Sequence, residues 1–286
     1  MTDEQSRGLG ADGYRTRPGR PPAATTEARA GAPRRGLRAT TPDETFAATA
    51  VRWDITRVPL DRIESSSIER ARHRFRASLP DLVWNAAALE GNTFTLPEVR
   101  TLLDGVTVGG RPLDDEKQVL ALVDGYTHLD ELVASGSFSL SKSVSDDLHR
   151  RVAIHEAIES GGFRGEGDVG GGGTVRLASG GLVVGVPQSE LAGRFAASAD
   201  FLEALDDPRE RALGYFVSAT RSQFYFDGNK RTARLMMTGL LMSEGYEAVS
   251  LPVARKFEFN KALDILFTDD DATPLMAFIA SCASRA

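Results

Sequence analysis

The sequence is poor in cysteine, in long apolar runs and in net positive charge, and each shortage excludes a class of protein. Its one cysteine, Cys282, rules out an intrachain disulfide framework and a cysteine-rich zinc site. No apolar run approaches the roughly 18–20 residues of a membrane-spanning helix. No compact apolar stretch near the N-terminus reads as a secretory signal. We therefore expect a cytoplasmic protein with no membrane partner.

Charge is unevenly distributed along the 286 residues. Lysine and arginine number 34 against 40 aspartates and glutamates, and the net charge of −6 makes nucleic acid an unlikely partner for the chain as a whole. Between Arg7 and Arg38, however, eight arginines face two acidic residues. Glycine, proline, alanine and threonine fill this stretch, so we predict that residues 1–45 form a disordered basic arm. The favoured interpretation is a solvated extension, and the alternative is a tether for nucleic acid or an acidic partner.

The rest of the chain has the periodicity of helices, with residues 46–110 expected as N-terminal helices and residues 111–286 as the core. The expected helices in these two parts include 61–76, 80–89, 114–134, 141–159, 188–205, 208–223, 230–244, 256–268 and 274–284. Residues 174–186 place β-branched and apolar residues on both sides of a Gly-Gly pair, which predicts a β-hairpin. The predicted fold class is therefore an all-α bundle that carries one β-hairpin.

Residues 223–234, Gln-Phe-Tyr-Phe-Asp-Gly-Asn-Lys-Arg-Thr-Ala-Arg, join two expected helices and combine the parts of an anion site. Gly228 lets a ligand approach the backbone, and the N–H groups that open the next helix attract anions. Arg231 and Arg234 lie three residues apart and share one helix face. Asp227 offers the hard oxygen ligands that suit Mg²⁺. The pattern predicts a polyphosphate site, and its alternative is a plain helix–helix turn with solvated basic residues. The expected phosphate ligands are Gly228, Asn229, Lys230, Arg231 and Arg234.

This segment resembles the signature loop of the Fic (Fido) domain family, whose pattern is His-x-Phe-x-Asp/Glu-Gly-Asn-Gly/Lys-Arg-x-x-Arg. The matching residues are Asp227, Gly228, Asn229, Lys230, Arg231 and Arg234. Tyr225 stands at the phenylalanine position, and Gln223 stands where the family has its catalytic histidine. The resemblance implies a Fic-type fold and the use of ATP with Mg²⁺. Fic enzymes typically transfer AMP to a hydroxyl of a target protein, a few relatives transfer other phosphate-linked groups, and the Doc branch transfers a phosphate.

Two further segments extend the resemblance over roughly residues 80–270. The stretch from Ala86 to Asn92 is similar to the family's inhibitory helix, placed ahead of the core, although Ala86 replaces its small hydroxyl residue. The resemblance implies that Glu90 pairs with Arg234 and keeps the terminal phosphate of ATP out of place, whereas on the simpler interpretation Glu90 ends a helix. The hairpin 174–186 matches the family's flap, which implies that a protein or small-molecule acceptor docks there.

The glutamine at position 223 leaves three hypotheses open, because an amide cannot act as a general base. In the first, the protein transfers AMP or another phosphate-linked group to an acceptor that is already anionic, and Gln223, Arg231 and Arg234 lie at the reaction centre. In the second, it is a non-catalytic, nucleotide-binding regulatory module. In the third, Gln223 is an introduced inactivating substitution, which we consider less favoured than a natural variant. The first hypothesis, the transferase, places Mg²⁺ on Asp227.

None of the four histidines has the spacing of a catalytic or metal-binding group. His155 is interpreted as a packed residue on an apolar helix face, and His149 as a surface or hydrogen-bonded buried residue. The glycine-rich run 161–173 is interpreted as a flexible linker to the hairpin. The sequence does not identify the acceptor, the transferred group or the oligomeric state.

Overall fold

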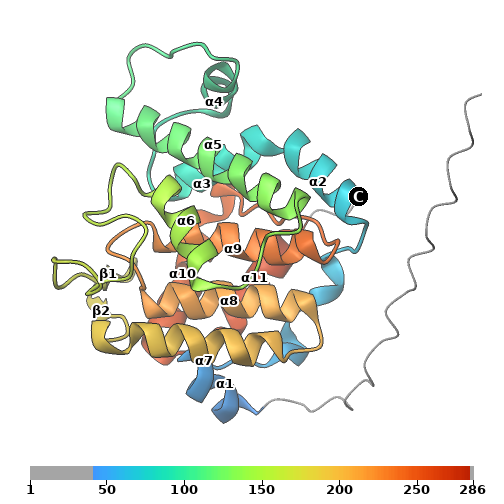
Figure 1. Ribbon diagram of the computed structural model, residues 1–286, viewed down its shortest axis with the longest axis vertical. Coiled ribbons are helices and arrows are strands. Elements are labelled where there is room, and N and C mark those ends of the chain that lie inside the picture. The colour runs from blue at the N-terminus through green and yellow to red at the C-terminus, as the bar shows by residue number, and fades with distance from the viewer. Residues whose placement is uncertain (1–40, 284–286) are drawn as a thin grey trace, which may run out of the picture. The chain divides into compact units, whose positions relative to one another are not determined.

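The computed structural model describes residues 41–283 (Figure 1). Within this range the chain forms eleven α-helices and one two-stranded antiparallel hairpin, which confirms the predicted fold class. The helices are α1 (Pro42–Thr49), α2 (Ile68–Ala77), α3 (Leu79–Leu89), α4 (Leu96–Leu103), α5 (Leu113–Ala134), α6 (Lys142–Val152), α7 (Leu191–Glu203), α8 (Pro208–Ser222), α9 (Asn229–Ser243), α10 (Lys256–Asp269) and α11 (Thr273–Ser281). The strands are β1 (Thr174–Arg176) and β2 (Leu182–Val184). None of the helices described here combines the length and hydropathy that a membrane span requires.

The first described helix, α1, begins inside the range 1–45, whose first 40 residues lie outside the described part of the chain. Thr41 caps it in a capping box with Glu44, and Pro42 occupies its first turn, where a missing N–H costs nothing. These local signals start a helix at Pro42 despite the basic, glycine-rich sequence that precedes it. Among the described residues, helix therefore begins at Pro42, inside the range predicted as a disordered arm.

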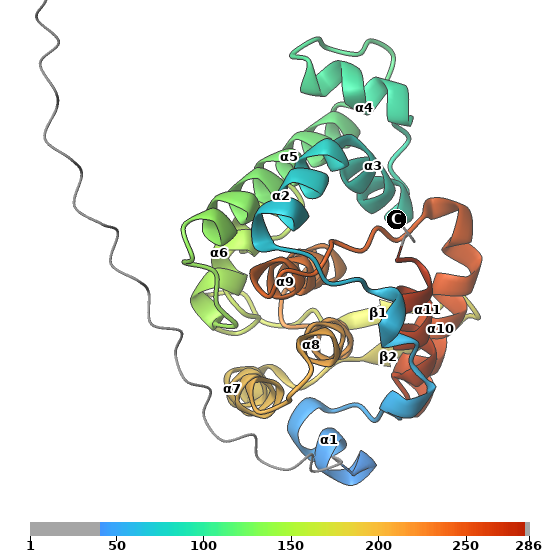
Figure 2. The same cartoon turned by 90° about the vertical axis from the view of Figure 1, so that its right-hand side faces the viewer.

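Helix α9 lies at the centre of the domain, with α8 on one side and α5 and α6 on the other (Figure 2). All of its residues from Arg231 to Met242 are buried, because neighbouring helices cover every face of it. Because α9 is buried in this way, the residues at its N-terminus are held in fixed positions. The short connection from α8 to α9 is the segment 223–228, so the predicted anion site lies at the end of the two described helices that pack most extensively against each other.

Helix α6 is shorter than predicted, since it ends at Val152 and not at residue 159. The Val152 carbonyl accepts a hydrogen bond of 2.9 Å from Arg231 Nη1, and the chain then turns at Ala153, whose carbonyl accepts from the N–H groups of residues 156 and 157. A tertiary contact therefore ends the helix where the local sequence would continue it. His155 lies in this turn and is exposed, so its interpretation as a packed core residue is wrong.

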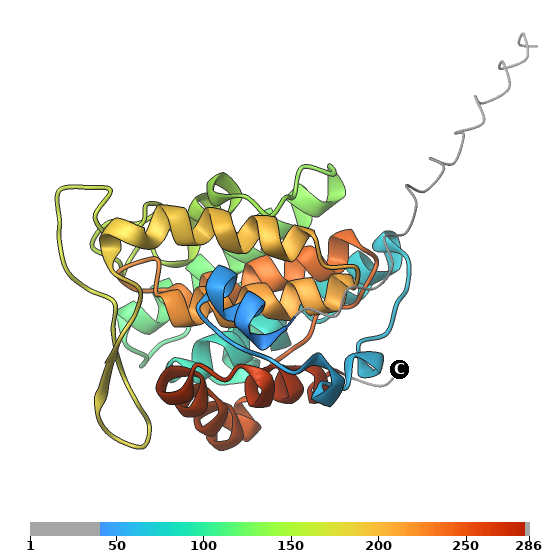
Figure 3. The ribbon, with the colours of Figure 1, turned by 90° about the horizontal axis from the view of Figure 1, so that it is seen from below.

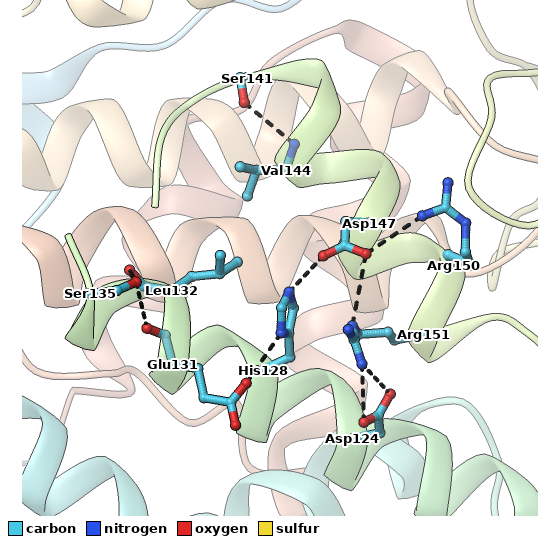
Figure 4. A network of polar contacts seen from close by, with 10 residues as sticks. All are labelled: Asp124, His128, Glu131, Leu132, Ser135, Ser141, Val144, Asp147, Arg150 and Arg151. Atoms are coloured by element: carbon cyan, nitrogen blue, oxygen red, sulfur yellow. Dashed lines mark hydrogen bonds and ion pairs between the residues drawn. The ribbon is translucent and has the colours of Figure 1, made fainter. Parts of the chain in front are cut away.

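A surface network of ion pairs joins α6 to α5 (Figure 4). His128 Nε2 lies 2.6 Å from Asp147, and Arg151 reaches Asp124 at 2.9 Å and Asp147 at 3.9 Å. Arg150 makes a longer contact of 3.5 Å with the same Asp147. Exposed pairs contribute little individually, about 0–1 kcal/mol each. Together they orient α6, which carries several of the groups that bond to the loop between α8 and α9.

The hairpin projects from the α7 side of the domain toward α10 and α11 (Figure 3). Its register pairs Thr174 with Val184 and Arg176 with Leu182. At its tip, the N–H groups of Ala178 and Ser179 donate to the carboxylate of Asp264 on α10, at 3.0 and 2.7 Å. A two-stranded hairpin is marginal by itself. Its contact with α10 holds it across the mouth of a cavity.

Candidate functional site

A cavity of about 470 Å³ lies between the start of α9, the hairpin and α10. It is open at the place that the sequence analysis assigned to a polyphosphate, and not filled by neighbouring apolar side chains. Seven of the eight predicted site residues line it: Glu90, Gln223, Asp227, Gly228, Asn229, Lys230 and Arg231. The hairpin contributes residues 174–178, and α10 contributes Asn260, Leu263, Asp264 and Phe267.

The active loop, residues 223–234, is held in shape by the side chain of Asn229. Its Oδ1 accepts from the Tyr225 N–H at 2.9 Å, and its Nδ2 donates to the Tyr225 carbonyl at 2.8 Å. The same Nδ2 donates to Gln223 Oε1 at 3.1 Å. These bonds use the Asn229 amide group within the loop, so what this residue offers to a ligand is its backbone N–H at the first turn of α9.

Gln223 occupies the C-cap of α8 in the left-handed region, with φ 55°. Its Nε2 donates to the Thr220 carbonyl at 2.7 Å, while its Oε1 accepts from Asn229. Both ends of the side-chain amide are therefore engaged by the protein, and the residue is 9% exposed. Gln223 lines the cavity as a fixed polar surface.

Gly228 is the N-cap of α9 and also has positive φ, at 73°. A Cβ at this position would come within 2.8 Å of the Ala153 side chain, so only glycine fits between the loop and the end of α6. The first N–H groups of α9 have no acceptor within the helix and carry the positive end of its dipole. The predicted anion-binding features are present at this turn.

Arg231 is a buried residue that connects the loop to the end of α6. It is 4% exposed, and its Nη1 donates to the Val152 carbonyl and to Glu156 Oε1, both at 2.9 Å. Its Nη2 donates to Asp227 Oδ1 at 3.3 Å. The guanidinium thus fixes Asp227, whose side chain is 60% exposed and borders the cavity.

His149, on α6, forms a hydrogen bond to the backbone of the loop, a role that the sequence did not specify. Its Nδ1 accepts from the Gly161 N–H at 2.8 Å, which leaves the proton on Nε2 to be donated to the Asp227 carbonyl at 2.9 Å. Burial lowers the pKa of His149 to about 4, so the ring is neutral at pH 7. It also stacks on Tyr225, with 3.7 Å between the ring centroids.

The tyrosine at the family's phenylalanine position has its own partners in this chain. The Tyr225 hydroxyl is buried and lies 2.7 Å from Ser145 Oγ, and it donates to Asp146 Oδ1 at 2.9 Å. Burial raises the pKa of Tyr225 well above its ordinary value, so the hydroxyl keeps its proton. Helix α6 thus supplies two polar groups for an atom that phenylalanine lacks.

We expect Tyr225→Phe to lower the free energy of unfolding by about 1–3 kcal/mol, because it leaves the buried Ser145 and the partly buried Asp146 with one partner fewer. Tyr246→Phe is the matched control, since no hydrogen bond of the Tyr246 hydroxyl is found in the described structure and Tyr246 is only half-buried. Urea unfolding of both variants measures the difference. Equal stability of the two variants would contradict a structural role for the Tyr225 hydroxyl.

Glu90 pairs with Lys230 and not, as the resemblance implied, with Arg234. Its Oε2 lies 2.9 Å from Lys230 Nζ, while its Oε1 is buried and has no hydrogen-bond partner among the described residues. Burial alone would raise the pKa of Glu90, but the charges of Lys230, Arg234 and Arg231 outweigh it and the pKa lies below its usual value. Lys230 is the residue that pairs with Glu90 because it lies in the first turn of α9 and lines the cavity. Arg234 lies one turn further along the helix.

Arg234 is the one predicted site residue that does not line the cavity. It is 2% exposed, and within the described structure none of its three guanidinium nitrogens has a hydrogen-bond partner. Burial raises the pKa of the neighbouring Tyr126 hydroxyl, and the positive charge of Arg234 partly offsets this increase. A buried guanidinium without an acceptor is costly, so its donors are available to an anion.

The glycine-rich run is not simply a linker to the hairpin. Gly171, Gly172 and Gly173 all have positive φ, and the carbonyls of the first two accept hydrogen bonds from Arg164 Nη1. Arg164 is buried and was not singled out from the sequence. The only signal for it was an arginine close before four successive glycines, which does not specify a contact by itself.

Comparison with known proteins agrees with this fold. The protein named "Protein adenylyltransferase Fic" of Drosophila willistoni is 31% identical to the chain over 209 residues, which make up 71% of this chain and 40% of that protein. A second protein of that name, from Drosophila persimilis, is 30% identical over 236 residues, 81% of this chain and 44% of its own length. The chain thus spans less than half of the length of these relatives. No protein-family model matches the chain.

Solved structures show the same fold. A Fic domain containing signaling protein of Bacteroides thetaiotaomicron superposes with a TM-score of 0.63 at 19% identity, over 85% of this chain and 92% of that one. Fic-1 of Caenorhabditis elegans superposes with a TM-score of 0.60 at 22% identity, over 76% of this chain and 67% of that one. The chain belongs to the Fic domain family, and its described residues have a mostly helical Fic-like fold.

Proposed function

We propose that the chain binds ATP with Mg²⁺ in the cavity and transfers AMP, or another phosphate-linked group, to an acceptor. The observation that carries this proposal is the buried guanidinium of Arg234, whose three nitrogens have no acceptor in the described structure. With Lys230 and Arg231 it places three cations at the dipole-positive end of α9. Lys230 and Arg231 pair with carboxylates, but Arg234 has no such partner among the described residues, and a phosphate group would supply one. The name of the Drosophila willistoni relative supports adenylyl transfer.

Asp227 is the residue that fits a magnesium ion. Its Oδ1 is used by the Gly228 N–H and by Arg231, and no contact of Oδ2 with the described residues is found. A carboxylate oxygen beside a phosphate site is the kind of ligand that Mg²⁺ takes, with water and phosphate oxygens as its other ligands. The ion would neutralise charge on the phosphates, and the protein would contribute the position of the carboxylate.

Gln223 restricts the acceptor, because it neither gains nor loses a proton and its amide is engaged at both ends. In the transfer step, an acceptor oxygen forms a bond to the α-phosphorus while the bond from that phosphorus to the bridging oxygen breaks. The electron pair leaves with pyrophosphate. A carboxylate or phosphate acceptor completes this step with no proton to remove, whereas a hydroxyl must lose its proton to solvent. We therefore favour an anionic acceptor.

The exposed strand β2 is the proposed place for the acceptor. Leu182 and Val184 are each 62% exposed on the hairpin, which covers the cavity beside Gln223. An extended segment of a target protein can add to such a strand through main-chain hydrogen bonds. A small acceptor would need only the cavity.

We propose that Glu90 restrains the site through Lys230, and we expect Glu90→Gln to tighten ATP·Mg²⁺ binding about ten-fold or more. The reason is that a buried carboxylate beside incoming phosphates costs several kcal/mol of repulsion. Titration calorimetry measures the change, with Glu131→Gln on the exposed surface of α5 as the matched neutralisation. Equal affinities in the two variants would remove Glu90 from the regulation of this site.

The same titration, combined with ATP labelled at the α- or γ-phosphate, separates transfer from the alternative function. Tight binding with label on the protein, on lysate proteins or on acidic metabolites supports the transferase. Tight binding with no labelled product supports a non-catalytic regulatory module, which the engaged amide of Gln223 favours. Absence of ATP binding in both wild type and Glu90→Gln would overturn both functions.

A further inference from the structure

Arg164 is a buried arginine whose side-chain hydrogen bonds are all accepted by backbone carbonyls. It is 4% exposed, and its Nε donates to the Gln223 carbonyl at 2.7 Å. Its Nη2 donates to the Val186 carbonyl at 2.9 Å, and its Nη1 to the Gly172 carbonyl at 3.2 Å. No carboxylate forms an ion pair with it in the part of the chain that the structure describes. Burial lowers the pKa of this guanidinium.

These acceptors belong to three segments that are distant in sequence. One is the glycine-rich run that enters the hairpin, the second is the residue that leaves it, and the third is the first residue of the active loop. The backbone N–H of Arg164 adds a further hydrogen bond, to the Phe224 carbonyl at 2.8 Å. One side chain therefore ties both ends of the flap, residues 174–186, to the loop that borders the cavity.

Two glycines at the base of the flap allow this close approach. A Cβ on Gly173 would lie 2.3 Å from the central guanidinium carbon of Arg164, and the residue has φ +76°. On the other side of the flap, a Cβ on Gly185 would lie 2.7 Å from the Cβ of Gln223. The base of the flap therefore passes against Gln223, at a distance that only glycine permits.

We propose that Arg164 is a positioning residue that fixes the register of the flap against Gln223 and so sets where an acceptor on the flap meets the cavity. This rests on the proposed function only for what the flap docks, because the contact itself is independent of nucleotide. An arginine suits the task since its planar group directs donors along several fixed directions at once. A lysine carries the same charge but lacks this fork.

The experiment follows amide hydrogen exchange in the full chain without nucleotide, in wild type and in Arg164→Ala. The reporters are the N–H groups of Gly185 and Val186, which donate to Gly173 and Ser222 carbonyls at 2.8 and 3.1 Å. We expect their exchange to accelerate about ten-fold or more while the amides of α8 and α9 keep wild-type rates, because local opening and global unfolding are separable. Unchanged flap exchange, or equal acceleration in α8 and α9, would overturn the proposal.

Chemical rescue separates positioning from a merely structural role. Ethylguanidinium, which fits the space that Arg164→Ala leaves, is expected to restore slow exchange at the two reporters, and ethylammonium is not. Equal rescue by both ions would show that charge alone matters and would overturn the proposal. If Arg164→Ala does not fold, Arg164→Lys serves in its place, with fast flap exchange expected and wild-type flap exchange contradicting the proposal. Failure of ATP to bind both the wild type and Glu90→Gln would overturn the proposed function and would leave the hydrogen-exchange result unaffected.

Discussion

Replacing Gln223 by histidine is expected to raise AMP transfer to hydroxyl acceptors by about 10²–10⁴-fold, the usual contribution of a general base. Position 223 borders the cavity at the C-cap of α8, the place where the family pattern has its histidine. The left-handed backbone there accepts histidine readily, so the exchange should not distort the loop. The remaining components of the site, the α9 N-terminus and its cations, are already in place.

The measurement is incorporation of label from α-labelled ATP into the protein itself and into lysate proteins. It is made in the Glu90→Gln background, so that restraint by Glu90 does not mask the gain. Gln223→Asn is the matched control, because it keeps an amide and is also compatible with positive φ. A gain shared by histidine and asparagine would show that loosening of the loop, and not proton transfer, is responsible. No gain despite tight ATP binding would contradict the transferase and favour the regulatory module.

The parts of this site that the sequence predicted are those that depend on neighbours along the chain. The glycine before α9, the first-turn N–H groups and the spacing of Arg231 and Arg234 all follow from one helix start. The hairpin followed from alternation around a Gly-Gly pair. Such features need only local geometry, and the structure has them at the expected residues.

The parts that could not be predicted depend on which distant groups meet. Lys230 and Arg234 are both cations on α9, and only the tertiary placement of α3, which packs on α5, decides that Glu90 at its C-cap reaches the lysine. His149 and Arg164 bind backbone carbonyls, which every residue possesses, so no pattern of side chains marks their partners. The early end of α6 has the same origin, because Arg231 takes the carbonyl of Val152.

The exchange of phenylalanine for tyrosine at position 225 bears on whether Gln223 is an isolated change. The Tyr225 hydroxyl has two polar partners on α6, Ser145 and Asp146, so the surroundings accommodate this departure from the family pattern. Gln223 is likewise bonded at both ends, to Thr220 and Asn229. A loop whose unusual residues are all satisfied by their surroundings favours a natural variant over an introduced inactivating substitution.

Arg234→Met is expected to separate stability from ligand binding. Arg234 is almost fully buried with no acceptor for its guanidinium in the described structure, so methionine of similar length removes a desolvated charge and fills the space. Replacing buried charged groups by apolar ones of like volume is often neutral or stabilising by about 1–4 kcal/mol. The free energy of unfolding, measured in urea, should therefore not fall.

The affinity of Arg234→Met for ATP·Mg²⁺ is expected to fall, although the free energy of unfolding does not. Hydrogen bonds to a charged phosphate contribute about 1.5–3 kcal/mol each, so Arg234→Met in the Glu90→Gln background should weaken binding by about 10–100-fold. Arg255→Met is the control, since it breaks an exposed pair with Glu258 away from the cavity. Lower stability together with unchanged affinity would mean that Arg234 belongs to the core, and the proposal of a triphosphate ligand would lose the observation that carries it. A stable protein with weakened binding is the outcome expected of a ligand-binding arginine, because the strict hydrogen bonds of the described structure leave its guanidinium without an acceptor.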